Sequence, residues 1–288
     1  MSAPLIGLVA HTGKAGALAM AARLRDEFAR RGAEVRIEAR TAEMMGEKGG
    51  LSVSELAGVC EIMVALGGDG TILQVVHEMA DCLTPIFGIN LGSLGFLTCV
   101  SSSAVEQAVE CIVTRRYVKT QRILLEMKIF RGDTTLARLT GLNDVVISRG
   151  AVSRLIRLQT WIDGAALTEY NADGLVICTP TGSTAYSLAA GGPILTPDCG
   201  VFVVTPICPH VLTNRSLVFS DSSTIAVSPC EHQGEIYVTV DGQHSTLIAH
   251  GDTVHIRKAR QCVPLAMLPG VSFFEVLRQK LKWSGTAI

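Results

Sequence analysis

The hydrophobic pattern of this chain changes its period once, between residues 114 and 119. Before that point, short apolar runs such as Leu5 to Ala10 and Ile62 to Leu66 alternate with helical stripes, as in residues 15–31. After it, apolar and polar side chains mostly alternate, as in Ile123 to Ile129. Strand–helix alternation is typical of a parallel sheet covered by helices, and a period of two is typical of antiparallel strands with one buried face. The first half is therefore predicted to be α/β and the second half β-rich.

The chain has 288 residues, which is long enough for two ordinary domains. We predict an α/β N-terminal domain with a parallel sheet over residues 1–116. A β-rich C-terminal domain is predicted over residues 117–270. Residues 271–288 form a C-terminal tail with a helix predicted from Phe273 to Trp283, and this tail is a candidate for docking on the first domain.

Several short signals indicate how the predicted elements begin and end. Asp163-Gly164 and Asp241-Gly242 each follow a predicted strand and indicate hairpin turns. Ser103 and Glu106 have the spacing of a capping box, which predicts a helix start. Residues 41–50 are polar and rich in glycine, so they are predicted to form a mobile loop.

Glycines surround an acid in the sequence Gly67-Gly68-Asp69-Gly70-Thr71, between a predicted strand and a predicted helix. Glycines there let a ligand approach the backbone, and the first N–H groups of a helix favour phosphate. A carboxylate beside phosphate is repelled, so Asp69 needs another role. Accepting a proton from a hydroxyl group and holding a magnesium ion would both suit it. In a parallel sheet this turn lies at the carboxyl edge of the strands, where Asn90 is expected as well.

The two common phosphate-binding loops are missing from the sequence. Gly13-Lys14 is followed by Ala15 instead of the Ser or Thr of a Walker A loop, and no GxGxxG follows the first strand. A second stretch, Asn171 to Leu195, is dense in hydroxyl groups and turn-forming residues. Ala185 within it would let a flat ring approach, and Tyr186 can border a base. The sequence therefore indicates a nucleotide site of a less common kind.

Composition excludes several classes of function. The 25 basic and 26 acidic residues give a net charge of −1, which provides no bulk attraction to nucleic acid or to an anionic membrane. No apolar run approaches the 18 residues of a spanning helix, and the start lacks the features of a signal peptide. The nine cysteines include no CxxC pair, which argues against a zinc site. We expect reduced core thiols in a cytoplasmic protein.

Seven segments of the sequence, in family order, resemble the NAD kinases. These are residues 67–71, 89–97, 142–146, 173–195, 206–215, 240–243 and 273–278. Diacylglycerol and sphingosine kinases share the Gly-Gly-Asp-Gly-Thr motif, so that motif alone is moderately specific. Joined to Asn143-Asp144 and to the Thr-Pro-Thr-Gly-Ser-Thr-Ala-Tyr run at residues 179–186, it becomes strongly specific.

The resemblance implies a two-domain enzyme with an NAD kinase-like fold. It would transfer a phosphoryl group from ATP, with a divalent metal such as Mg²⁺, to the 2′-hydroxyl of the adenosine ribose of NAD. The small-molecule substrates would then be NAD and ATP, with inorganic polyphosphate open as a second donor. Members of the family assemble as homodimers or homotetramers, and the same is expected here.

The candidate site residues follow from the matched positions. Asp69 is the candidate catalytic proton acceptor, and no residue is assigned as a metal ligand. Two interpretations of His210 remain open: it faces the phosphates of a bound nucleotide, or it is a structural histidine. The candidate binding residues are Gly67, Gly68, Gly70, Thr71, Asn143, Asp144, Arg154, Asn171, Asp173, Thr181, Ser183, Thr184, Ala185, Tyr186, Ser187, Leu188, Ala189, His210 and Gln243.

Two other functions remain open from the sequence. A lipid or sphingoid alcohol could be the acceptor of the phosphoryl group, although the Asn143-Asp144 pair and residues 179–186 speak against it. The chain could also be a catalytically silent sensor of NAD(P), although a sensor has no need of Asp69 as a base. A hydride-transferring dehydrogenase fits less well, because the Rossmann glycine pattern is missing.

Overall fold

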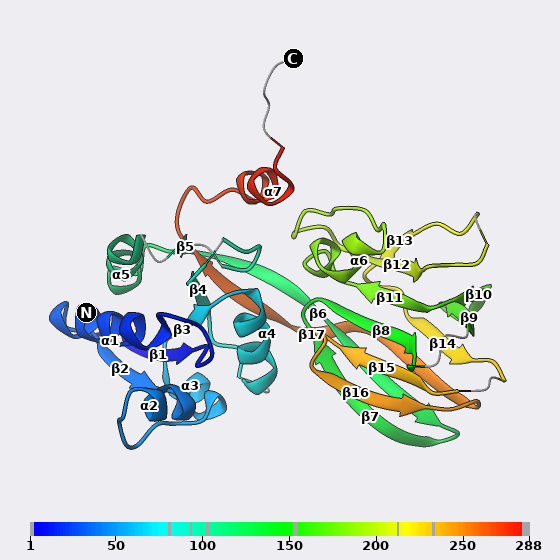
Figure 1. Cartoon of the computed structure of the whole chain (residues 1–288), viewed down its shortest axis with the longest axis horizontal. Coiled ribbons are helices and arrows are strands. Elements are labelled where there is room, and N and C mark those ends of the chain that lie inside the picture. The colour runs from blue at the N-terminus through cyan, green and yellow to red at the C-terminus, as the bar shows by residue number, and fades with distance from the viewer. Residues whose placement is uncertain are drawn as a thin grey trace, which may run out of the picture. The chain divides into compact units, whose positions relative to one another are not determined.

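The computed structural model of the chain describes residues 3–79, 82–92, 94–98, 100–101, 104–151, 155–211, 213–231 and 234–283. The chain forms two compact units (Figure 1). Residues 1–121 and 263–288 belong to the first unit, and residues 122–262 belong to the second. The chain therefore passes between the units twice, within the long strands β6 (Val118–Arg131) and β17 (Asp252–Met267).

The first unit alternates between strands and helices, coloured blue to cyan in Figure 1, and ends with a C-terminal helix in red. Its elements are β1 (Leu5–Ala10), α1 (Ala17–Arg30), β2 (Glu34–Ile37), α2 (Ala39–Met44), α3 (Val53–Val59), β3 (Ile62–Gly67), α4 (Asp69–Glu78), β4 (Ile86–Asn90), β5 (Val100–Ser101), α5 (Val105–Val113) and α7 (Phe273–Leu281).

The strands of the first unit pair in parallel in the order β2-β1-β3-β4, with β5 and the end of β17 beside β4. β3 and β4 are buried along their whole length, because helices cover both faces of the sheet. α1 and α5 pack on the face that carries Phe87 and Ile89. α4 packs on the other face, where its Ile72 lies over Gly88. The α/β fold predicted for the first half of the chain is confirmed.

The carboxyl edge of this sheet is the part that matters for function. β1, β3 and β4 all end there, and their register places Ala10 beside Leu66 and Gly67 beside Asn90. The Gly-rich turn that follows β3 therefore lies at the same edge as Asn90, as predicted from the strand–turn–helix pattern.

The second unit is built almost entirely of antiparallel strands. Its elements, besides parts of β6 and β17, are β7 (Thr134–Gly141), β8 (Asp144–Arg149), β9 (Ile156–Ile162), β10 (Ala165–Ala172), β11 (Gly174–Cys178), η2 (Gly182–Thr184), α6 (Tyr186–Ala189), β12 (Val201–Ile207), β13 (Leu217–Ser220), β14 (Ile225–Pro229), β15 (Ile236–Val240) and β16 (His244–Ile248).

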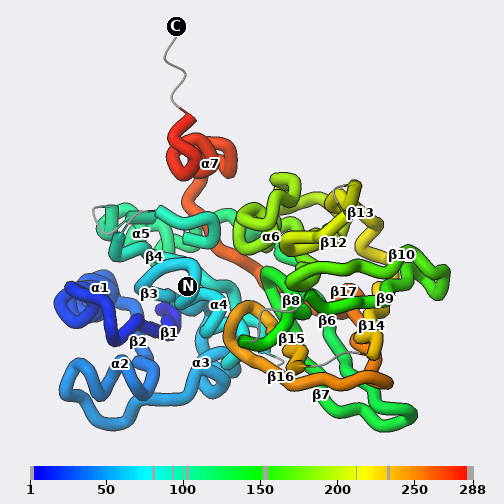
Figure 2. Tube along the Cα trace, turned by 45° about the vertical axis from the view of Figure 1, so that its right-hand side comes forward, coloured from blue at the N-terminus to red at the C-terminus, as the bar shows by residue number. Residues whose placement is uncertain are grey.

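Two sheets pack face to face in the second unit (Figure 2). One has the order β13-β12-β11-β8-β15-β16, and the other contains β10-β9-β14-β17, with β6 beside β17 and β7 beside β6. Their inner faces share one apolar core, to which β8 contributes Val145 and Ile147. Val146 points to the outer face instead, where Ala190 and Leu195 cover part of the sheet. The β-rich, antiparallel second half is thus confirmed.

Both predicted Asp-Gly hairpins are present. Asp163 and Gly164 have φ angles of 51° and 82°, and Asp241 and Gly242 have 50° and 67°. These left-handed backbones connect β9 to β10 and β15 to β16.

Two predictions about local structure need correction, and a third concerns a residue outside the described ranges. Residues 41–50 were predicted to form a loop, but α2 occupies residues 39–44, because the side chain of Glu38 caps it by accepting bonds from Arg40 N and Thr41 N. Ser103 of the predicted capping box lies outside the described residues, and Ala104 holds the N-cap position of α5. The prediction of core thiols is wrong for most cysteines, since only Cys60, Cys111 and Cys178 of the eight described ones are buried.

The helices of the described residues are short. α1 has 14 residues, and α4 has 10. No helix in the described ranges combines the length and the apolar character that a membrane span requires.

Candidate functional site

The Gly-rich turn joins β3 to α4, and it leaves little room for a side chain at its first two glycines, Gly67 and Gly68. A Cβ atom on Gly67 would lie 2.1 Å from Thr71 Oγ1, so only glycine fits there. Gly68 is the N-cap residue, and its N–H donates to Thr71 Oγ1 at 3.3 Å. α4 then begins at Asp69, so the first backbone N–H groups of the helix lack intrahelical partners. Such a helix start attracts negatively charged groups.

The carboxylate of Asp69 is held by the backbone of a neighbouring loop. Its Oδ2 accepts a hydrogen bond from Phe96 N at 2.8 Å, and its Oδ1 accepts one from Leu97 N at 3.0 Å. A Cβ atom on Gly95 would lie 1.9 Å from Oδ1, so the loop can approach this closely only because residue 95 is glycine. The two hydrogen bonds fix the direction of the Asp69 carboxylate, and the residue is only half-buried, so it stays accessible.

Asn90 and Thr98 hold that loop in turn. Asn90 is 3% exposed, and its Nδ2 donates to Thr98 Oγ1 at 3.1 Å. Gly95 N donates to the same hydroxyl oxygen at 2.8 Å. Residues 89–97 were one of the segments that resemble the family, but no role was predicted for them. The structure shows that this segment positions the carboxylate of Asp69.

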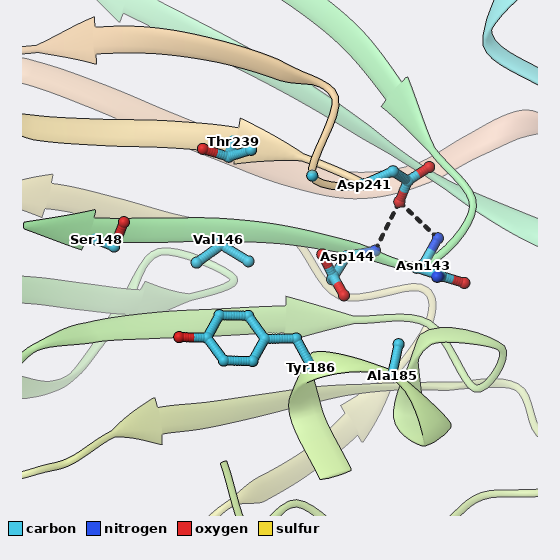
Figure 3. A pocket seen from close by; sticks show the side chains of 9 residues that line it. Asn143, Asp144, Val146, Ser148, Ala185, Tyr186, Thr239 and Asp241 are labelled. Carbon is cyan, nitrogen blue, oxygen red and sulfur yellow. Dashed lines mark hydrogen bonds between the residues drawn. The ribbon is translucent and has the colours of Figure 1, made fainter. Parts of the chain in front are cut away.

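A pocket of about 360 Å³ lies on the outer face of the six-stranded sheet in the second unit (Figure 3). β8 supplies Asp144, Val146 and Ser148, which share one face because side chains alternate along a strand. Ala185 and Tyr186 lie to one side of β8, and Thr239 and Asp241 lie to the other. The remaining lining residues are Asn143 and Gly242.

Asp241 organises the acidic end of this pocket. Its carboxylate accepts hydrogen bonds from Leu142 N at 2.7 Å, Asn143 N at 2.7 Å and Asp144 N at 2.9 Å. These three N–H donors hold the carboxylate in one position, in a site where the residue is 8% exposed. They also fix the entry into β8 at residues 142–144.

Asp144 lies in the same acidic environment, and within the described part of the chain no backbone N–H donates to its carboxyl group. The residue is 5% exposed, and burial together with the negative charge of Asp241 raises the pKa of its carboxyl group to about 7. Asp144 therefore changes its charge near neutral pH. Because β8 begins at Asp144, Asn143 precedes the strand, and both residues line the pocket although neighbours on a strand point to opposite faces.

The hydroxyl-rich segment packs tightly against this entry. A Cβ atom on Gly182 would lie 2.1 Å from the carbonyl oxygen of Asn143. The hydroxyl of Ser183 donates a hydrogen bond to Pro180 O at 2.6 Å and accepts one from Leu195 N at 3.1 Å. The hydroxyl of Ser187 forms a hydrogen bond with Thr205 Oγ1 at 3.1 Å. These buried hydroxyl groups shape the segment that presents Ala185 and Tyr186.

The other predicted residues of this segment differ in exposure. Thr181 is 7% exposed, and its hydroxyl has no hydrogen-bond partner among the described residues. Thr184 donates to Thr181 O at 3.2 Å. Leu188 is half-buried and Ala189 is exposed, and neither lines the pocket.

The remaining predicted residues that the structure describes are not among those that line the pocket. Asp173 forms an ion pair with Arg149 at 2.7 Å, and this bond raises the pKa of the arginine. The backbone carbonyl oxygen of Asn171 accepts a hydrogen bond from the backbone N–H of His210. His210 itself is exposed. Gln243 is exposed in the β15–β16 turn. Arg154 lies outside the described residues.

Sequence reasoning missed several residues of the site. Asp241 was interpreted as a turn residue within the matched segment 240–243 and was given no role in the site. Its partners at residues 142–144 are 97 to 99 positions away. Ser148 could have been found from its spacing, because it shares a strand face with Asp144. Lys14 was set aside with the failed Walker A motif, yet its Nζ lies 3.0 Å from Gly67 O.

These two places offer complementary chemistry. The Gly-rich turn combines helix N–H groups with a positioned carboxylate, which suits a phosphate group and a proton acceptor. The pocket combines an aromatic ring with acidic and hydroxyl groups, which suits a nucleoside. A chain that carries both has the features of a phosphotransferase acting on a nucleotide-like substrate.

Comparison with known proteins defines the family. Residues 6–117 match the model of the ATP-NAD kinase N-terminal domain, and residues 142–268 match that of the ATP-NAD kinase C-terminal domain. The chain is 41% identical over 254 residues to an NAD kinase of Syntrophotalea carbinolica, covering 88% of this chain and 89% of that protein. The chain therefore belongs to the NAD kinase family.

Solved structures support the same fold. A yeast NADH kinase crystallised with NADH aligns with a TM-score of 0.90 at 24% identity, covering 100% of this chain and 90% of that chain. An NAD kinase from Archaeoglobus fulgidus in complex with ATP aligns with a TM-score of 0.77 at 24% identity, covering 98% of this chain and 100% of that chain. At this level of identity the similarity concerns the fold, and it confirms the two-domain NAD kinase-like architecture.

Proposed function

We propose that this chain transfers a phosphoryl group from ATP to the 2′-hydroxyl of the adenosine ribose of NAD and so forms NADP. The observation that carries this proposal is the 41% identity to an NAD kinase over 88% of the chain. That similarity comes together with the positioned carboxylate of Asp69 at the start of α4. A lipid acceptor has no comparable support, because both family models are those of ATP-NAD kinases.

Asp69 is assigned as the proton acceptor. A ribose hydroxyl is a poor nucleophile at neutral pH, and its oxygen becomes reactive as its proton leaves. A positioned carboxylate that takes the proton in the transition state typically contributes about 10²–10⁴-fold to the rate. Phe96 N and Leu97 N hold the Asp69 carboxylate in one direction, so no reorientation is needed during the reaction.

The phosphates of the donor are assigned to the Gly-rich turn. The first N–H groups of α4 point away from the helix body, and no side chain at Gly68 or Gly70 blocks them. In-line transfer needs the phosphoryl group to be oriented and its charge to be balanced, and a fixed backbone provides both without reorganisation.

A divalent metal such as Mg²⁺ fits this arrangement as part of the ATP substrate. The described residues contain no group of three or more His, Cys, Asp or Glu side chains that could form a resident metal centre. Mg²⁺ bound to ATP keeps several waters and phosphate oxygens as ligands and needs only one or two carboxylates from the protein. Asp69 is the acid at the turn that could serve in this way. The metal would neutralise charge on the phosphates.

NAD is assigned to the pocket in the second unit. Asn143 and Asp144 would bind the adenosine half of NAD, and Tyr186 would border its ring. The predicted residues Asn171, Asp173 and His210 stay candidates for further contacts, as does Gln243. Thr181 is the candidate of most interest among the hydroxyl groups, because its oxygen is buried and has no hydrogen-bond partner among the described residues.

Assembly as a homodimer or homotetramer and a cytoplasmic location are further parts of the proposal, and both rest on the resemblance to the family. Light scattering on the purified protein, coupled to gel filtration, measures the assembly directly. A mass of one chain, 30.6 kDa, would contradict it.

The test of the proposed function is a product assay on the purified chain. NAD, ATP and Mg²⁺ are incubated with the protein, and NADP is measured by an enzyme that accepts only the 2′-phosphorylated cofactor. Diacylglycerol and sphingosine are tested as acceptors, and polyphosphate as donor, in parallel reactions. Formation of NADP in preference to lipid phosphate supports the proposal. Tight binding of NADP without turnover under any donor would instead indicate a silent sensor.

A further inference from the structure

Lys14 lies at the Gly-rich turn although it comes from a different strand end. It follows β1 in the loop that leads to α1, and its Nζ donates to Gly67 O at 3.0 Å. A Cβ atom on Gly68 would lie only 2.9 Å from the same Nζ atom. The ammonium group of Lys14 is therefore in direct contact with the turn that precedes Asp69.

The loop that carries Lys14 is fixed against the sheet. His11 N donates to Leu66 O at 2.8 Å, and Lys14 N donates to His11 O at 3.1 Å. The ring of His11 also accepts a bond from Gly13 N at 3.2 Å. Gly16 ends the loop with a left-handed backbone, at a φ angle of 78°, and α1 begins at the next residue. These bonds place the base of the lysine side chain beside the end of β3.

The charge of Lys14 has no acidic partner among the described residues. An ammonium group can donate three hydrogen bonds, and the one seen here goes to a neutral carbonyl oxygen. The oxygens of Asp69 accept from Phe96 N and Leu97 N instead. A positive charge beside free helix N–H groups, with no carboxylate paired to it, is suited to a bound anion.

We propose that Lys14 binds the triphosphate of ATP in the phosphoryl transfer, an inference that rests on the proposed function. Its ammonium group donates charge-assisted hydrogen bonds to the phosphate oxygens while the Gly-rich turn supplies backbone N–H groups. In a Walker A loop the lysine follows the glycines directly. Here the lysine is 53 positions away from Gly67 along the sequence and reaches the glycines from the end of a neighbouring strand.

Two substitutions separate the charge of Lys14 from its hydrogen bond. Lys14→Gln keeps a donor for the bond to Gly67 O and removes the charge, whereas Lys14→Arg keeps the charge. Lys48→Gln is the matched control, because Lys48, like Lys14, is an exposed lysine of the first unit. We expect Lys14→Gln to lower kcat/KM for ATP by about 10- to 100-fold, the loss expected for a hydrogen bond to a charged group. KM for NAD and Tm should stay unchanged, and Lys14→Arg should keep most of the activity.

A binding measurement makes the test independent of turnover. Titration calorimetry with inorganic tripolyphosphate should show about 10-fold weaker binding to Lys14→Gln than to the wild-type chain or Lys48→Gln. If the wild-type chain forms no NADP, the proposed function fails, but this titration still measures the role of Lys14. Equal tripolyphosphate binding by wild type and Lys14→Gln would overturn the inference. An equal loss in Lys14→Gln and Lys14→Arg with a lower Tm would also overturn it, because it would show that Lys14 only holds the turn.

Discussion

The Gly-rich turn of the first unit and the β15–β16 turn of the second unit use an aspartate in the same way. Asp69 accepts hydrogen bonds from Phe96 N and Leu97 N, and Asp241 accepts them from the N–H groups of residues 142–144. The two carboxylates differ in exposure and in backbone. Asp69 is half-buried at a helix start, whereas Asp241 is 8% exposed in a left-handed turn with a φ angle of 50°.

This difference is the one we expect between a carboxylate that is proposed to act on a substrate and one that stabilises the protein. Asp241 has three short bonds to backbone donors, so its capacity to accept hydrogen bonds is largely used within the protein. It shapes the entry into β8, and its charge raises the pKa of Asp144. Asp69 has two such bonds and is more accessible, so it is oriented and still able to receive a proton. The exposure and the number of backbone donors therefore agree with the two roles that we propose for Asp69 and Asp241.

Among substitutions that leave Asp69 itself in place, the largest effect is expected when the direction of its carboxylate is changed. In Gly95→Ala the new Cβ atom would lie 1.9 Å from Asp69 Oδ1, so the carboxylate must move. A displacement of about 1 Å can reduce catalysis about 100-fold. We expect kcat to fall by about that factor while the affinity for NAD is kept.

Gly92→Ala is the control for this change. It adds the same methyl group to the same loop, where the nearest atom, Asn90 Oδ1, is 3.7 Å away. Steady-state kinetics should show near wild-type turnover for Gly92→Ala. Similar kcat values for the two variants would mean that the orientation of Asp69 does not limit the reaction.

The structural role of Asp241 predicts a loss of stability. Asp241→Asn leaves three backbone donors with one carbonyl acceptor, so we expect the free energy of unfolding to fall by about 2–4 kcal/mol. Urea unfolding measures this value. Asp163→Asn is the control, because Asp163 occupies a similar Asp-Gly turn with φ 51° but accepts one bond, from Thr224 N, at an exposed site. A loss no larger than that of Asp163→Asn would contradict the role of Asp241.

The buried carboxyl group of Asp144 predicts stability that depends on pH. Its pKa rises from 3.8 to about 7 on folding, so the folded chain holds a proton that the unfolded chain has lost between those values. The contribution of Asp144 to stability is therefore greatest below about pH 4 and is lost as the pH rises to about 7.

Asp144→Asn removes this loss, because asparagine does not ionise. We expect the variant to be more stable than the wild-type chain by about 1–3 kcal/mol at pH 8 and about equal to it at pH 4. Urea unfolding at the two pH values tests this, with the exposed Asp133→Asn as control. Loss of NAD binding in the stabilised variant would show that Asp144 is kept for function. A stability difference that does not change with pH would refute the assignment.

The smallest effect is expected at the aromatic side of the pocket. Tyr186 is 45% exposed, so Tyr186→Ala should change the free energy of unfolding by less than about 0.5 kcal/mol. Loss of a ring contact should raise KM for NAD by about 3- to 10-fold with kcat nearly unchanged. Phe274→Ala, at another exposed aromatic residue, should change neither constant. An unchanged KM for NAD in Tyr186→Ala would place the base elsewhere.

The fold was predictable where local sequence determines local structure. β3 and β4 appear as continuous apolar runs because they are buried on both faces. The two Asp-Gly turns were predictable because both positions need left-handed backbones. α2 was missed because a charged side chain, Glu38, caps it, and its polar sequence carries no apolar stripe.

The candidate site was predictable only in part, for a similar reason. Asp69 was found because strand, glycines and helix follow one another directly in the sequence. Lys14 and Asp241 were missed because their partners are 53 and 97 to 99 positions away, and no periodicity encodes such contacts. Only the register of β1 and β3, and of β8 and β15, brings these groups together.

The most direct test of the account is the rate of the chemical step when Asp69 cannot accept a proton. Single-turnover transfer from ATP to NAD is measured with both substrates saturating, in the wild-type chain, Asp69→Asn and the control Asp133→Asn. We predict a rate at least about 100-fold lower in Asp69→Asn alone, with NAD binding retained. A rate in Asp69→Asn within a few-fold of the wild-type rate would contradict the assignment of this carboxylate.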